Sequence, residues 1–386
     1  MRLYQLLFKI GRPIHLKPED VRLVYIDDDT HWSLLNGDEP TSRKYLAALV
    51  INASKPLTKA AVIGLDVELL APLDDQPGHD ASERSDDDQK LFDAIQSAAN
   101  QGVPVVLASV YYQDENLRNR LLPNIYADRD VFMPKGKDCA HISCPSFGYI
   151  NLPVDKRLVP LAREVVVAGN GPAQKLESFA QVLAEAKLEP FAIQRQSIPT
   201  DSTPEDDDRT FGNFLPEEQY ETIPITKLAI GDQEAENQCA GKIVLIGGHW
   251  HELEGFGKLV DQHLSPAGSM SGLGLHANYV ETLLQHQSAH EWPLWFDIII
   301  DLLVGLIVYT LFEIWHAWWK ITLLLVGVSC LPLLIAYISL VTLNVYLDFV
   351  LPIELYFLHI VYELVYEAVK AHFQARTQKP TPLLSG

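Results

Sequence analysis

Short apolar runs alternate with longer amphipathic stretches through the first 290 residues. Four runs are rich in Val, Ile and Leu and have the length of buried strands: 21–26, 61–65, 103–108 and 242–246. Helical patterns follow at 42–53, 86–100 and 275–285. The second of these has three Asp residues in its first turn, where negative charge favours a helix start. This alternation predicts an α/β fold with a mainly parallel sheet flanked by helices.

The last quarter of the chain is apolar enough to enter a bilayer. Residues 321–343 run for 23 positions without a charge. As a helix this run measures about 34 Å, more than a hydrocarbon core of about 30 Å. The flanking segments are also long enough to span, although each carries acidic residues. We therefore predict three transmembrane helices within residues 291–370, packed as two hairpins, at about 294–315, 321–343 and 346–367.

Charge separates the two parts of the chain. There are 30 Lys and Arg against 50 Asp and Glu, a net charge of −20. Only four of the basic side chains lie after residue 290, so residues 1–290 form an acidic polar body. A charge this negative excludes nucleic-acid binding of the kind in which Lys and Arg replace the counterions of phosphates. The average hydrophobic content, 48%, is that of a soluble protein and hides the apolar tail.

Basic residues near the predicted spans indicate their orientation. Lys320 lies in the first connection and Lys370, Arg376 and Lys379 follow the last span, whereas the second connection has none. The first connection and the segment after the last span, which carry these basic residues, then belong in the cytoplasm. This makes 371–386 a cytoplasmic tail and places 1–290 outside the cytoplasm. Residues 1–10 are too short for a signal peptide, so either the first span exports the body or the gene start lies upstream. A cytoplasmic body in an inverted topology is the alternative.

Five ordered motifs resemble the CHASE2 domain, an extracytoplasmic sensor module of bacterial signalling proteins. They are VYIDDDTHWSL at 24–34, KAAVIGLDVELLAP at 59–72, the strand and helix of 86–109, GYINLPVD at 148–155, and GKIVLIGG, DQHLSPAG and GLGLHANYVETLL within 241–284. The resemblance covers nearly the whole chain, because the family's domain is usually followed by three transmembrane helices. It implies a multi-pass protein of the bacterial inner membrane with a periplasmic or extracellular domain.

The sequence departs from the family pattern in three places. The family's usual Asp-Gly-x-x-Arg after Asp155 is replaced by KRLVPL at 156–161. The usual N-terminal transmembrane helix and the cytoplasmic kinase or cyclase domain are not found in this sequence. The resemblance therefore implies a sensor that relays its signal to a separate partner instead of to an output domain of its own.

Five polar side chains are candidates for a ligand site. Asp27 and Asp66 end predicted strands, as does Gly247, and ligands of open α/β sheets bind outside the carboxyl ends of strands. Asp261, His263 and His276 follow the last strand and can reach the same edge. The functional interpretation is a pocket for an unknown small ligand. The structural alternative is that the carboxylates cap helices and the histidines are core residues. One Asp with two His also offers zinc ligands, but no spacing fixes their geometry.

Other candidate chemistry is sparse. Cys139 and Cys144 are close enough in sequence to form a disulfide in an oxidising compartment, and two free thiols are the alternative. No GxSxG elbow, GxxxxGK[ST] phosphate loop or HExxH zinc motif is present, so we expect no enzyme activity, no metal and no cofactor.

In the tail, His359 and Glu363 are one helical turn apart. Ionisable residues at membrane depth tend to face protein or water, so these two are candidates for a contact with another subunit. The alternative is that the acidic residues of the tail lie mostly at the interface with water.

Taken together, the sequence predicts a membrane-anchored sensor in contact with lipid, with a protein partner or a second copy bound through its transmembrane helices. The alternative is a structural or scaffold subunit of a membrane protein complex.

Overall fold

The computed structural model describes a defined part of the chain: residues 18–35, 37, 42–69, 85–113, 118–122, 124, 126, 145–153, 156–166, 173–188, 210–212, 214–253, 256–285 and 289–291, with the pair 345–346 and single residues in the last quarter. The chain divides into two compact units, Met1–Ala289 and His290–Gly386. Among the described residues no helix has the length and hydrophobicity needed to cross a bilayer. The three predicted spans, with His359 and Glu363, lie outside the described residues apart from single positions.

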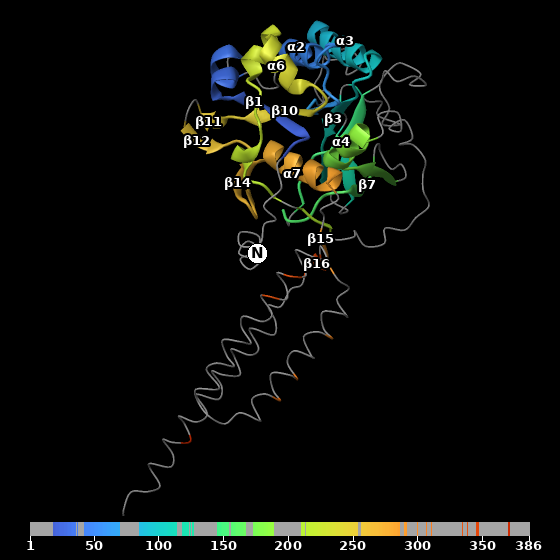
Figure 1. Cartoon of the computed structure of the whole chain (residues 1–386). Helices are drawn as coiled ribbons and strands as arrows, with labels where there is room; N and C mark the ends of the chain where they lie inside the picture. Colours follow the sequence, from blue (N-terminus) through green and yellow to red (C-terminus); the bar gives the residue numbers. More distant parts are fainter. Residues whose placement is uncertain are drawn as a thin grey trace, which may run out of the picture. The chain divides into compact units, whose positions relative to one another are not determined.

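A parallel sheet of five strands forms the centre of the first unit (Figure 1). Its order is β1 (Val21–Asp27), β10 (Ile243–His249), β2 (Val62–Asp66), β3 (Val105–Ser109) and β6 (Ser146–Tyr149). The last strand in the sequence, β10, therefore lies between the first two, with Val24 paired to Ile246 and Ile246 to Leu65. All four predicted strands are confirmed within two or three residues at each end, and the α/β class with them.

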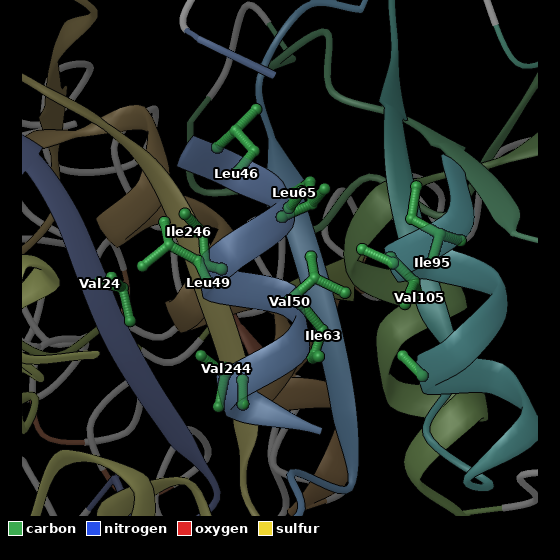
Figure 2. Close-up of a cluster of buried hydrophobic side chains, with 14 of the residues drawn as sticks. Val24, Leu46, Leu49, Val50, Ile63, Leu65, Ile95, Val105, Val244 and Ile246 are labelled. Carbon is green, nitrogen blue, oxygen red and sulfur yellow. The ribbon is translucent and has the colours of Figure 1, made fainter. Parts of the chain in front are cut away.

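Helices cover both faces of the sheet (Figure 1). One face packs against α2 (Arg43–Ala53), α3 (Asp86–Asn100), α5 (Ile225–Ile230) and α6 (Gln233–Cys239). Val24, Ile246 and Ile63 from the strands meet Leu49 and Val50 of α2 there, all with no exposed surface (Figure 2). Removing such apolar area from water is the main term that stabilises the layer.

The opposite face packs against α4 (Phe179–Leu188) and α7 (Gly272–Leu284). Because side chains of a strand alternate between faces, Leu23, Val62 and Leu245 point to this second layer. α7 is buried along most of its length, which explains its run of mainly apolar and small residues.

Local signals in the sequence account for the helix boundaries. Ser85 caps α3 by accepting a hydrogen bond from the Asp88 N–H, and the Asp88 carboxylate accepts one in return from the Ser85 N–H. This capping box explains why the helix begins at the predicted residue. α7 begins three residues earlier than predicted because Ser271 caps it, with its hydroxyl accepting from the Gly274 N–H at 3.0 Å.

Smaller elements surround the central layers. A mixed sheet with both antiparallel and parallel pairs has the order β4 (Tyr111–Gln113), β5 (Asn119–Leu121), β7 (Ala162–Val166) and β8 (Ala173–Glu177). Two hairpins follow β10: β11 (His251–Leu253) with β12 (Phe256–Leu259), and β13 (Gln262–Ser265) with β14 (Gly268–Ser271). The remaining pieces are the π-helix η1 (Asp29–Leu34), the 3₁₀ helix η3 (Glu217–Gln219), β9 (Thr210–Phe211), β15 (Ala289–Glu291) and β16 (Val345–Tyr346).

Candidate functional site

Polar side chains gather where β1, β10 and β2 end. The register pairs Asp27 of β1 with His249 of β10, and Gly247 of β10 with Asp66 of β2. These strands are neighbours at a reversal of strand order, since β10 inserts between β1 and β2. Such a point at the carboxyl edge of a parallel sheet is where α/β folds place their ligands.

Asp66 lies on the α4 and α7 side of this edge. Its Cβ is close to Gly247, where an added methyl group would fall 3.1 Å from it and 2.9 Å from Leu273 Cδ1. Within the described residues its carboxyl group makes no hydrogen bond. Burial, together with the negative charges of Asp261 and Glu68, raises the pKa of Asp66 to about 8. The group therefore carries its proton at pH 7 and can donate a hydrogen bond.

Asp261 occupies the turn between β12 and β13 and adopts a left-handed backbone with φ of 60°. Its Oδ1 lies 2.6 Å from His263 Nε2, and its carbonyl accepts from the Gly272 N–H at 3.0 Å. A Cβ on Gly272 would fall 1.8 Å from Asp261 Oδ2, so only glycine leaves room for this carboxylate at the start of α7. A negative charge there is favourable because the first N–H groups of a helix carry partial positive charge.

His276 is a core residue of α7. It is 2% exposed, and its ring lies edge-on to Phe179 at 5.4 Å between centroids. Burial lowers the pKa of His276 to about 4, so the imidazole is neutral at pH 7. A hydrogen bond to the Ile150 backbone uses one nitrogen, and Nδ1 has no hydrogen-bond partner among the residues that the structure describes. The charges of Asp261, His263 and Lys156 act on this ring, which places the four groups in one neighbourhood.

Asp27 does not join these residues. It is exposed, and its Oδ1 accepts a hydrogen bond from the Thr30 N–H at 2.9 Å, where it stabilises the start of η1. Two strand spacings, about 9–10 Å, separate β1 from β2 across β10. Of the five candidates, four therefore form one group: Asp66, Asp261, His263 and His276. Asp27 instead caps backbone at the start of η1, as in the structural alternative.

Glu217 is a functional candidate that sequence reasoning missed. Its Oε1 accepts from the Tyr25 hydroxyl at 2.6 Å and from the Ser271 hydroxyl, and its Oε2 accepts from the Ser271 N–H at 2.8 Å. His249 Nε2 lies 3.8 Å from the same carboxylate. Burial and this carboxylate raise the pKa of the Tyr25 hydroxyl, which therefore remains a donor. The only sequence signal is the acidic pair Glu217 and Glu218 after a proline, which is common in loops.

Two further α7 residues explain the GLGLHAN stretch. Asn278 is fully buried, and its amide accepts from the Leu215 N–H and donates to the Leu215 and Gly274 carbonyls. Gly274 leaves room for Glu217, whose Cδ would lie 2.9 Å from an added Cβ. At the other end of the helix, Glu281 accepts from the N–H groups of Asp20 and Val21 at 2.9 and 3.0 Å. These residues hold α7 to β1 at both ends.

The arrangement offers hydrogen-bonding groups and charge. Among the described ranges, no three His, Cys, Asp or Glu side chains form a group that can hold a metal ion. Lys156 interacts electrostatically with Asp261, and burial lowers the pKa of its ammonium group. Cys139 and Cys144 lie outside the described residues, whereas Cys239 is a buried free thiol whose Sγ donates to the Ala235 carbonyl at 3.5 Å.

Comparisons with known proteins point to one family. Residues 1–329 match the CHASE2 domain, and neither the curated proteins nor the solved structures gave a match. The match covers most of the 386 residues, so it includes the parallel sheet, both hairpins and α7. CHASE2 domains are sensory extracellular domains. The chain therefore belongs to the CHASE2 domain family.

Proposed function

We propose that the protein is a membrane-anchored extracytoplasmic sensor in which α7 transmits a change at the carboxyl edge of the sheet to residues 290–386, and through them to a partner protein. The family supports the sensory role. The observation that carries the proposal is the position of α7, which begins at the candidate site and is the last helix before the second unit.

Contacts at the first turn of α7 make it responsive to the site. Glu217 binds the Ser271 cap, and the Asp261 carbonyl binds the Gly272 N–H. A ligand or a proton that altered the Glu217 carboxylate would change the free energy of this turn, because that carboxylate accepts from the N–H and the hydroxyl of the cap residue Ser271. A difference in free energy between two states is what a sensor requires.

The last turn of α7 would pass the change on to residues 290–386. Glu281 ties it to the first residues of β1, and burial raises the pKa of this carboxyl group. Five residues after Leu284 the chain enters β15, where His290 and Glu291 pair in parallel with Val345 and Tyr346. The predicted span 294–315 follows directly. A movement of α7 along its axis would thus pull on this segment.

The alternative function is a scaffold subunit, and exposed apolar residues favour it. Ile51, Leu57 and Ile230 are 48%, 96% and 82% exposed. Asn52 donates to the Leu228 and Ala229 carbonyls, so the ends of α2 and α5 that carry Ile51 and Ile230 adjoin. A stoichiometric partner that co-purifies with the wild type but not with Leu57→Ser or Ile230→Ser would support this alternative.

Protease digestion of spheroplasts tests the proposed placement. We expect added protease to cleave the domain of residues 1–290 while an epitope fused after Gly386 stays intact until the cells are lysed. A cytoplasmic protein serves as the control for lysis. A domain that resists protease in intact spheroplasts and is cleaved only after lysis would refute the extracytoplasmic placement, and the sensor role would fall with it.

A further inference from the structure

We propose that the β11–β12 hairpin is held by a proton-sensitive latch, in which His251 pairs with Asp28, and that protons are a stimulus of this domain. The second half of the proposal rests on the proposed sensor function, whereas the latch does not. The hairpin directly follows β10, so it lies beside the candidate site at the carboxyl edge.

The latch consists of two hydrogen bonds between one residue pair. The His251 N–H donates to Asp28 Oδ1 at 2.7 Å, and His251 Nδ1 lies 2.7 Å from Asp28 Oδ2. Asp28 is the residue before η1 and follows the last residue of β1, so the pair joins segments that are 223 positions apart in sequence. A neutral imidazole can already donate through Nδ1–H to the ionised carboxylate, and an imidazolium adds the attraction between two opposite charges.

Ring stacking also connects the β11–β12 hairpin to η1. Trp250 stacks on His31 of η1 with 4.3 Å between centroids and 12° between planes. The hairpin is closed at its base by the Val260 N–H, which donates to the Trp250 carbonyl at 2.8 Å. If the pairing of His251 with Asp28 is lost, the described contact that remains between the base of the hairpin and η1 is the stacking of Trp250 on His31.

Carboxylates are the most frequent charged groups around His251. Asp28 faces it from the end of β1, with Asp27 and Asp29 on either side. His249 of β10 also acts on Asp28 and is itself 3.8 Å from Glu217. The hairpin adds Glu252 and Lys258, both exposed, and η1 adds His31. The neighbours named here are five carboxylates, two further histidines and Lys258.

The direction of the pH effect follows from the pair. Burial acts to raise the pKa of Asp28, but the hydrogen bonds from the His251 backbone and side chain and the nearby His249 hold it below its ordinary value. The stabilisation from the ionised Asp28 is therefore present above about pH 4 and is lost as the pH falls through the folded pKa. Histidine side chains in general lose their proton between about pH 5 and 8, and a neutral imidazole lacks the attraction between opposite charges. The latch is strongest in mildly acidic conditions.

Two more pairs of a histidine with a carboxylate lie in the same segment. His249 faces Glu217 at 3.8 Å, and His263 faces Asp261 at 2.6 Å. The residues from His249 to His263 thus carry three histidines, each beside a carboxylate that lies at the carboxyl edge or at the start of α7. A change in either pair would reach α7, because Glu217 binds the Ser271 cap and the Asp261 carbonyl binds the Gly272 N–H.

Hydrogen–deuterium exchange of the full chain in lipid nanodiscs tests the latch. Exchange of peptides covering 250–260 is compared between about pH 5.5 and about pH 7.5 after correction for intrinsic exchange rates. Because the His251 and Asp28 side chains are 38% and 30% exposed, we expect protection to be about three- to fivefold greater at the lower pH. Local exchange is chosen over melting temperature because Asp66 and His276 also change global stability in this range.

His251→Gln and Asp28→Asn are expected to abolish this pH dependence, since each removes one charge of the pair and keeps a polar side chain. His263→Gln, the matched control, should leave the dependence of 250–260 in place. The latch is overturned if either His251→Gln or Asp28→Asn retains the full wild-type dependence. A pH-dependent hairpin with no pH effect on exchange in α7 would retain the latch and reject protons as the transmitted stimulus.

Discussion

Replacing Asn278 by alanine is expected to lower the free energy of unfolding by about 3 kcal/mol, roughly 8 °C in melting temperature for a domain of this size. The Asn278 amide is fully buried and satisfies both the N–H and the carbonyl of Leu215. Alanine leaves these two backbone groups without partners inside the α7 layer. A buried polar group that loses its partner costs about 1–3 kcal/mol.

Asn237 provides the matched control for this change. It also lies in a helix, but it is exposed, and its described side-chain bond is a 3.3 Å contact from the Gln233 amide. Asn237→Ala should change stability by less than about 0.5 kcal/mol. Thermal unfolding of both variants, followed by circular dichroism, gives the comparison. Equal melting temperatures for the two would show that the Leu215 contacts contribute little.

Gly148→Ala is the second large effect, expected at about 2–3 kcal/mol of destabilisation. A Cβ at this position of β6 would lie 2.5 Å from Phe179 Cα and 2.8 Å from Phe179 N. These are backbone atoms at the first turn of α4, so relief requires the strand and the helix to separate. Denaturant unfolding measures the loss, and the reduced packing should lower the midpoint concentration.

Gly64→Ala tests whether the backbone contact is the cause. Its nearest atoms are the ends of Leu245, Leu183 and Phe179, the closest at 2.7 Å. Side-chain ends move more easily than backbone, so this variant should lose only about 1 kcal/mol. A larger loss at Gly64 than at Gly148 would contradict the explanation given for β6.

Four of the five central strands and the helices α2, α3 and α7 could be predicted because their signals are local. The apolar runs at 21–26 and 242–246 and the Ser85 capping box each lie within one element. Strand order could not be predicted, because β10 reaches its place between β1 and β2 through contacts more than 170 residues apart. The pattern predicts no strand at β6, whose four residues include a glycine and a serine.

The candidate site was predicted in part for a similar reason. Asp66 ends a predicted strand, and Asp261, His263 and His276 follow the last one, so the rule for open sheets placed them together. Asp27 obeys the same rule, but its nearest backbone donor is the Thr30 N–H, and local capping prevails. Glu217 lies in a short segment without periodicity, and its role appears only when Tyr25, Ser271 and His249 surround it.

The family motifs prove to be largely structural where the structure describes them. Asn151 of GYINLPVD uses its amide to pair with the Tyr111 N–H and carbonyl, both at 2.8 Å, in the manner of a neighbouring strand. Gly272, Gly274 and Asn278 of the α7 motif make room for, or bind, the segments that cross the start of the helix. Under the proposed function, the residues that would respond to a stimulus are the ionisable groups that these contacts bring together.

Coupling through α7 is the central claim, and exchange at its far end is the most direct test. The helix has 13 residues and is about 20 Å long. In the full chain in nanodiscs, Glu217→Ala should speed exchange at residues 280–291 by at least about fivefold, the equivalent of one net hydrogen bond, while the control Glu218→Ala should not. If exchange in Glu217→Ala becomes faster at the first turn of α7 but stays unchanged at residues 280–291, this result would contradict coupling through α7.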